Sequence, residues 1–165
     1  MKTLTLIRHA KSSWKHPDLS DFKRPLNQRG HGDLPGLVKR VTQQLPRPDA
    51  LIFSGAHRTL ETSRPLAEAW QLKPDQYLER QSAYEASLNT LLLLLQEQPE
   101  DSSQLVLVGH NPGMSELLAF LTATPARHYP TAAVAQIELA IESWQALEQG
   151  CGQLRWFDYP KLHTD

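Results

Sequence analysis

Short apolar runs alternate with amphipathic stretches along the first two-thirds of the chain. The runs have the length and residue types of buried strands, and the stretches between them carry apolar residues at helical spacing. The predicted strands are residues 3–7, 49–53, 77–80 and 104–108. The predicted helices between and after them are residues 31–45, 56–70, 87–98 and 111–122. Ser87 is the expected cap of the third helix, and Asn111 is the expected cap of the fourth, with Pro112 at its first position.

This alternation predicts an α/β fold. Strands that alternate with helices form a mainly parallel sheet with helices on both faces, which is a three-layer α/β/α sandwich. Three later runs, residues 134–139, 144–147 and 154–157, are predicted as further strands, some of them antiparallel hairpin partners. No linker interrupts the pattern, so residues 1–165 are expected to form a single domain.

One long polar segment does not fit the alternation. Residues 8–30 show no periodicity, and a structureless stretch of this length in a small domain indicates either function or disorder. In α/β sheets, ligands bind beyond the carboxyl ends of the strands. The segment follows the first strand directly, so we expect it to contribute to a binding site.

Composition and charge narrow the class of protein. The chain has 165 residues, 40% of them hydrophobic, which is ordinary for a globular domain. The formal net charge of −1 does not provide the basic field that non-specific nucleic-acid binding requires. The lone Cys151 and the lack of a signal peptide or membrane span predict a cytoplasmic protein with no membrane partner. A monomer is expected, although the sequence carries no direct signal of oligomeric state. No clustered cysteine and histidine spacing predicts a metal site, and no cofactor is expected.

Side chains that could bind or transfer a chemical group come directly after the predicted strands. Arg8, His9 and Lys11 follow the first strand, Ser54 and Arg58 follow the second, and His110 and Asn111 follow the fourth. Glu85 lies near the end of the third strand. A single histidine in such a place is most simply a solvated loop residue. Arginine and histidine recur at the carboxyl ends of several strands, where ligands bind in such sheets, so we expect them to form one shared site.

These residue types suit phosphoryl transfer. Arginine forks match phosphate oxygens in bidentate geometry, and the helix beginning at Pro112 would offer backbone N–H groups to an anion. A neutral imidazole is a competent nucleophile, and nearby arginines favour its neutral form. The set predicts transfer through a phosphohistidine without a metal.

At this point the sequence resembles the histidine phosphatase superfamily. Arg8-His9-Ala10 is similar to its RHG/RHA signature, the segment from Ser54 to Thr62 is similar to its S-x-x-x-R-x-x-x-T block, and Val108 to Pro112 resembles its second histidine block. The likeness is closest to the small SixA-type phosphohistidine phosphatases. Their R-H-A-K-S-S-W and R-P-L-x-x-R-G segments match residues 8–14 and 24–30, so the resemblance covers nearly the whole chain.

The resemblance implies a phosphoglycerate-mutase-like fold and a role for each matching residue. His9 would carry the phosphoryl group, while Arg8, Arg58 and His110 would bind its oxygens. Glu85 stands where family members often have an acidic residue, and it is either the general acid or a charge on the rim.

Several other residues have open roles. Lys11, Ser12, Ser54 and Asn111 are candidates for substrate binding. The alternatives are a solvated loop lysine for Lys11, loop capping for Ser12, and a hydrogen bond to an active-site arginine for Ser54. Arg24 and Arg29 are expected to hold the long loop through ion pairs, with Asp21 as a partner for one of them; the alternative is that they face the substrate. Thr62 shares a helix face with Arg58, and Trp14 could line the rim of the pocket.

The expected function is hydrolysis of phosphohistidine on a partner protein. Only 28 residues run from Arg58 to Glu85, counting both, which leaves little room for a lid over the pocket. An open pocket suits a phosphorylated side chain presented by another protein. The alternatives are a phosphatase of small phosphoesters or sugar phosphates and a non-catalytic phosphate-binding module; a mutase fits less well.

Overall fold

A mixed β-sheet forms the middle layer of the structure, a computed structural model that describes residues 1–163. Its strand order is β3-β2-β4-β1-β5-β6. β1 to β4 run parallel, whereas β5 is antiparallel to β1 and β6 is antiparallel to β5. The strands are β1 (Lys2–Arg8), β2 (Ala50–Phe53), β3 (Tyr77–Glu79), β4 (Gln104–Gly109), β5 (Val134–Leu139) and β6 (Gly152–Asp158). The predicted mainly parallel sheet is confirmed.

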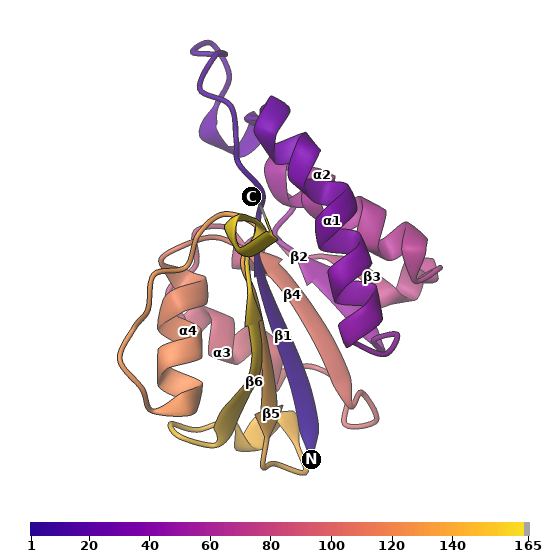
Figure 1. The fold of residues 1–165 in the computed structure, drawn as a ribbon. Helices are drawn as coiled ribbons and strands as arrows, with labels where there is room; N and C mark the ends of the chain where they lie inside the picture. Colours follow the sequence, from indigo (N-terminus) through magenta and orange to yellow (C-terminus); the bar gives the residue numbers. More distant parts are fainter. Residues whose placement is uncertain (164–165) are drawn as a thin grey trace.

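Helices cover both faces of this sheet (Figure 1). α1 (Gln28–Gln44) and α2 (His57–Ala69) lie on one face, and α3 (Leu88–Gln96) and α4 (Gly113–Thr122) lie on the other. Each pair of helices packs its apolar side on the sheet, so the sheet separates two hydrophobic cores. The three-layer α/β/α expectation is therefore confirmed.

The helix starts follow local capping chemistry. α1 begins earlier than the sequence pattern indicates, because the Asn27 side chain accepts a hydrogen bond from the Gly30 amide at 2.8 Å. Ser87 caps α3 as predicted. α4 begins at Gly113, one residue later than expected, with Pro112 at the capping position and the Asn111 side chain accepting from the Ser115 amide.

The prediction of a strand over residues 144–147 is wrong. Trp144–Ala146 is a turn of 3-10 helix, capped by the Ser143 side chain, which accepts from the Gln145 amide. Trp144 and Leu147 lie three positions apart, a spacing that fits one helical turn and places both side chains in the core. The fully buried Trp144 ring donates its N–H to the Ser102 carbonyl oxygen at 2.7 Å.

The polar segment after β1 is ordered by long-range hydrogen bonds. The Arg24 guanidinium donates to the Ser12 hydroxyl at 3.1 Å and to the Ser13 carbonyl at 3.0 Å. Ser12 also forms a β-bridge with Leu26. In Figure 1 the segment extends past the carboxyl ends of the strands, where it forms one side of the site described next.

The strand register brings the distant motifs together. Arg8 at the end of β1 lies beside Gly109 at the end of β4, and Phe53 at the end of β2 lies beside Val108. His9, Ser54 and His110 therefore begin their loops at one edge of the sheet. No helix among the described residues has both the length and the apolar character needed to cross a membrane.

Candidate phosphoryl-transfer site

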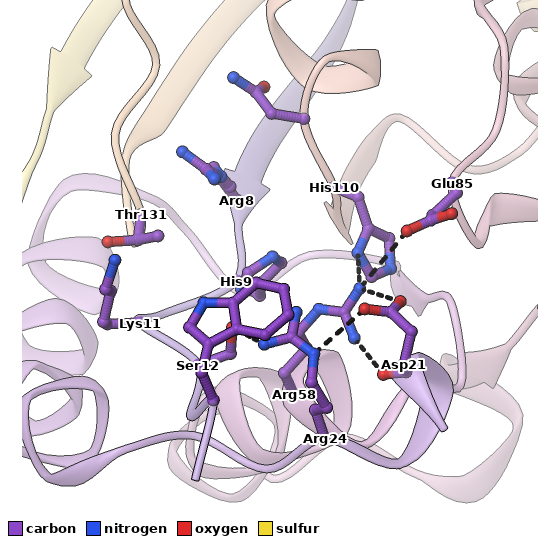
Figure 2. A pocket seen from close by; sticks show the side chains of 12 residues that line it. Arg8, His9, Lys11, Ser12, Asp21, Arg24, Arg58, Glu85, His110 and Thr131 are labelled. Atoms are coloured by element: carbon purple, nitrogen blue, oxygen red, sulfur yellow. Dashed lines mark hydrogen bonds and ion pairs between the residues drawn. The ribbon is translucent and has the colours of Figure 1, made fainter. Parts of the chain in front are cut away.

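A pocket of about 260 Å³ opens at the carboxyl ends of β1 and β4 (Figure 2). It collects eight of the nine residues proposed from the sequence for catalysis or substrate binding, and the missing one is Ser54. The residues that line it are Arg8, His9, Lys11, Ser12, Trp14, Asp21, Arg24, Arg58, Glu85, His110, Asn111 and Thr131.

His9 lies at the base of the pocket with a defined tautomer. It is buried, and its Nδ1 lies 2.7 Å from the Ala10 carbonyl oxygen, which can only accept a hydrogen bond. Nδ1 therefore carries the proton and Nε2 keeps a free lone pair. Burial is the main reason that the pKa of His9 falls from 6.5 to about 3; His110, Arg58 and Arg8 lower it further, against the hydrogen bond to Ala10. His9 is thus neutral and nucleophilic at physiological pH.

His110 is oriented by a directional chain of hydrogen bonds. The Thr59 hydroxyl donates to the Ala56 carbonyl, so the Ser54 hydroxyl must donate to Thr59 and accept from His110 Nε2 at 2.7 Å. His110 Nδ1 then accepts from Arg58 Nη2 at 3.3 Å. Burial, followed by the charge of Arg58, lowers the pKa of His110 to about 4. The second histidine is therefore also neutral.

The prediction that Ser54 binds substrate is corrected by this chain. Ser54 is fully buried behind His110 and does not reach the pocket. Its hydroxyl positions the imidazole of His110, and not an active-site arginine as the sequence interpretation suggested.

Arg58 and Arg8 supply the positive charge of the site. Arg58 is buried on the first turn of α2, where its Nε has no hydrogen-bond partner among the described residues. Arg8, half-buried, donates from Nη1 to the Tyr129 carbonyl at 2.9 Å, and its Nε is likewise unpartnered within residues 1–163. Buried donors without partners are costly, so both guanidiniums retain capacity for an anion.

Asp21 lines the pocket, whereas the sequence analysis had predicted only its ion pair with an arginine of the loop. It pairs with Arg24 at 3.1 Å, as expected, but it also accepts from Arg58 Nη2 at 3.0 Å and from the Tyr84 hydroxyl. Its backbone carbonyl accepts from Arg58 Nη1 at 2.7 Å. Partial burial raises the pKa of Asp21, but the bonds from Tyr84 and Arg58 outweigh it and hold this pKa well below its usual range. Only the nearby Arg24 could have suggested Asp21 from the sequence.

Glu85 lies at the rim of the pocket. Its Oε1 is 3.9 Å from Arg58 Nη2, and its side chain is largely exposed. Its backbone φ of 46° is left-handed, an unusual conformation for glutamate that is found more often at functional sites. The structure thus places Glu85 beside the arginine that the sequence assigned to phosphate binding.

The structure changes two expectations: that the N-terminus of α4 offers backbone N–H groups to an anion, and that the Asn111 side chain binds substrate. The amides of Met114 and Ser115 are hydrogen-bonded within the first turn, to the His110 carbonyl and the Asn111 side chain. The N-terminus of α4 therefore does not present these N–H groups to an anion. Asn111 lines the pocket, but its oxygen caps the helix and its amide nitrogen lies 3.4 Å from the Tyr129 carbonyl.

The basic residues Arg24, Arg29 and Lys11 differ in their burial and in their contacts. Arg24 is buried and holds Ser12, Ser13 and Asp21 in place, which agrees with the structural role expected for it. Arg29 and Lys11 differ, because both are exposed and neither side chain forms a hydrogen bond or ion pair with another residue of the described chain. The ion pair expected for Arg29 is not formed within residues 1–163, which leaves the alternative that Arg29 faces the substrate.

Neighbouring side chains complete the site. Thr62 on α2 accepts from the Ala10 amide at 3.0 Å and donates to the Arg58 carbonyl at 2.8 Å, so it ties the His9 loop to the Arg58 helix. Trp14 lines the rim as predicted and stacks on Arg24, with 3.6 Å between the guanidinium carbon and the ring centre. Thr131 also lines the pocket. Residues 130–133 resemble a segment of the SixA-type proteins, which is the signal in the sequence, but no role was predicted for Thr131.

Positive charge predominates among the side chains that line the pocket. Four cations, Arg8, Lys11, Arg24 and Arg58, line the pocket against two carboxylates. Among residues 1–163, no group of three or more histidine, cysteine or acidic side chains is arranged to hold a metal ion. The site thus offers a neutral imidazole nucleophile inside a ring of anion-binding groups.

Comparison with known proteins supports the fold and the family resemblance. No protein-family model matches the chain. An uncharacterized chloroplastic protein of Arabidopsis thaliana is 25% identical over 156 residues, covering 87% of this chain and 69% of that protein.

Solved structures are more informative. A protein from Agrobacterium tumefaciens assigned as a SixA phosphohistidine phosphatase is 26% identical, with a TM-score of 0.79 over 96% of this chain and 98% of that one. One from Nakamurella multipartitia with the same assignment has a TM-score of 0.82 at 23% identity over 96% of each chain. A mycobacterial glucosyl-3-phosphoglycerate phosphatase is more distant, with a TM-score of 0.69 at 13% identity, over 94% of this chain and 99% of that one. The resemblance drawn from the motifs is confirmed.

Proposed function

We propose that this chain, which has the fold of the histidine phosphatase superfamily, is a phosphatase that carries the phosphoryl group on His9. The observation on which this proposal rests is the state of His9. Its Nδ1 proton is held by the Ala10 carbonyl, so the Nε2 lone pair is available in a pocket ringed by guanidinium groups. A binding module would have no need of a nucleophile prepared in this way.

The reaction proceeds in two steps. His9 Nε2 attacks phosphorus and forms a P–N bond while the bond from phosphorus to the leaving group breaks. The leaving atom takes a proton from water or from Glu85. Water then attacks the phosphoryl group and loses a proton, the P–N bond breaks, and inorganic phosphate and neutral His9 are released.

Positive charge around the phosphoryl oxygens stabilises the transition state. Arg8 and Arg58 each have a buried Nε–H without a partner among the described residues. Preorganised donors of this kind contribute about 3–4 kcal/mol each when removed singly. His110 lies 5.3 Å from His9 between ring centres, but its one N–H donates to Ser54 and its other ring nitrogen accepts from Arg58, so in this tautomer it acts by orienting Arg58 and not as a donor to phosphate. The neutral histidines add no charge of their own, which leaves the arginines as the main source of stabilisation.

The substrate that fits this site best is phosphohistidine on a protein. α2 is followed within a short span by β3 and Glu85, so no lid is inserted between α2 and Glu85. Trp14 stands at the rim with 75% of its surface exposed, a position suited to contact with a partner protein. The imidazole leaving group of phosphohistidine is a far weaker base than an alkoxide and needs little help from an acid.

Covalent trapping tests the proposed reaction. Incubation with a phosphohistidine protein, followed by rapid denaturation in alkali, should leave an acid-labile phosphoryl group on wild-type protein and none on His9→Ala. His57→Ala is the matched control, because His57 is exposed and only one residue from Arg58. A wild-type protein that releases phosphate without any labelled intermediate would contradict the proposal.

Substrate choice and metal dependence are tested in the same assay. We expect phosphate release with a chelator present, and a kcat/KM that is higher for the phosphohistidine protein than for a phosphoserine peptide or an aryl phosphate. A higher kcat/KM for the aryl phosphate would leave His9 as the proposed nucleophile and would change the proposed substrate to a small phosphoester. Loss of activity on chelation would contradict the metal-free step.

A further inference from the structure

A second cavity, of about 480 Å³, lies beside the phosphoryl pocket. Arg8, Lys11 and Thr131 line both cavities. We call the second cavity the basic cleft and define it by Arg8, Lys11, Arg29, His128, Tyr159 and Lys161. Of these residues, only Arg8 takes part in the phosphoryl-transfer step described above.

The charge of the basic cleft has one sign. Arg8, Lys11, Arg29 and Lys161 contribute four cations, and no aspartate or glutamate of the described chain lines the cleft. The carboxylates of the phosphoryl pocket lie on its other side: Figure 2 shows Lys11 and Thr131 on one side of His9, and Asp21 and Glu85 on the opposite side. Negative groups beyond the phosphoryl group are therefore favoured only toward the cleft.

The backbone holds two of these cations close together. The Lys11 carbonyl accepts from the Asn27 amide at 3.0 Å, and a Cβ on Gly30 would lie only 2.1 Å from the same carbonyl oxygen. The first turn of α1, with Arg29 in it, thus packs directly against Lys11. Both side chains are exposed and, within residues 1–163, neither has an ion-pair partner. Their charges are available to a ligand.

We propose that the basic cleft binds an acidic segment that flanks the phosphohistidine in the partner protein. This inference rests on the proposed function and adds a specificity to it. Carboxylates next to the phosphorylated residue would meet Lys11 and Arg29, while Tyr159 offers an apolar surface to the peptide backbone. The chain as a whole has a net charge of −1, so the attraction is confined to this cleft and favours a local acidic motif over an extended polyanion.

The expected preference is moderate. Exposed ion pairs are individually weak, so two or three together support a preference of about ten-fold for an acidic segment at low salt. Salt screens such contacts, and the preference should therefore shrink as ionic strength rises.

Matched peptides test the proposal. Two histidine peptides, phosphorylated on the imidazole, would carry either acidic or neutral residues on both sides. Wild-type protein should show a kcat/KM about ten-fold higher for the acidic peptide. Arg29→Glu should bring the ratio to about one or below it, and Arg29→Lys should keep it. Arg64→Glu, the same change of charge on an exposed position of α2 that lines neither cavity, should also keep it.

Binding separates this inference from the proposed reaction. The His9→Ala variant should bind the acidic phosphopeptide more tightly than the neutral one, and adding Arg29→Glu should abolish the difference. If wild-type protein hydrolyses neither peptide but this binding difference persists, the phosphatase proposal fails and the acidic-segment site stands. If wild-type protein treats both peptides alike, or Arg29→Glu leaves the ratio unchanged, the inference is overturned while the phosphatase proposal stands.

Discussion

Arg58 and Asp21 define how the site responds to an anion. Arg58 donates to the Asp21 carboxylate and to its backbone carbonyl, and its Nη2 also donates to His110. A phosphoryl group bound to Arg58 would stand close to the Asp21 carboxylate and be repelled by it. The carboxylate thus orients the guanidinium and weakens phosphate binding, which also favours product release.

Replacing this carboxylate separates its two effects. Asp21→Asn keeps the backbone contact to Arg58 and removes the negative charge, so inorganic phosphate should inhibit about three- to ten-fold more strongly. The competitive inhibition constant of phosphate is the measurement. Asp18→Asn, on the same loop and exposed, should leave that constant unchanged. Weaker inhibition in Asp21→Asn would mean that orientation of Arg58 outweighs repulsion.

Glu85 is tested by the basicity of the leaving group. A general acid contributes more when the leaving oxygen is a stronger base. Glu85→Gln should lower kcat about 100-fold on phenyl phosphate, and less than about ten-fold on 4-nitrophenyl phosphate or a phosphohistidine peptide. Equal losses on all three substrates would show that Glu85 acts only as a charge beside Arg58.

At the level of the elements, some features follow from local sequence and others do not. β1, β2 and β4 were predictable because each is a run of mainly apolar and β-branched residues that ends at polar residues or glycine, and the Ser87 cap was predictable from residue type alone. The path of residues 8–30 was not. It depends on contacts such as Leu26 N–H to Glu61, 35 positions apart, which no periodicity encodes.

The same limit applies to the site. His9, Arg58 and His110 could be placed because they follow strands whose carboxyl ends meet at one edge of the sheet. Asp21 enters the pocket only through the folding of the long loop. Arg29 was misassigned because a basic residue near an acidic one in the sequence does not need to pair with it in space.

Gly30 offers a test of the contact between α1 and the His9 loop. Gly30→Ala would place a Cβ against the Lys11 backbone, which must shift, so we expect a loss of about 1–3 kcal/mol in unfolding free energy and a lower kcat/KM. Gly32→Ala is the matched control on the same helix, since nothing lies within 4 Å of its added Cβ. It should stabilise the protein by about 0.5–1 kcal/mol. Similar effects of both changes on stability would refute the proposed contact.

At the scale of the whole molecule, the buried histidines couple folding to pH. The folded-state pKa is about 3 for His9 and about 4 for His110, against 6.5 for an ordinary histidine. The folded chain therefore binds fewer protons than the unfolded chain between these values. Stability must be complete above pH 6.5 and must fall as the pH drops through this range toward the folded-state values.

Chemical denaturation at pH 8 and pH 5 measures this coupling. At pH 5, His9 and His110 should each lower the free energy of unfolding by roughly 2 kcal/mol relative to pH 8. His9→Gln cannot titrate, so its loss between the two pH values should be smaller than that of wild-type protein by roughly this amount. Asp21 does not interfere, because its lowered pKa keeps it ionised at both values. An identical loss in both proteins would show that His9 is not held neutral by the fold, and the case for it as a prepared nucleophile would lose its main support.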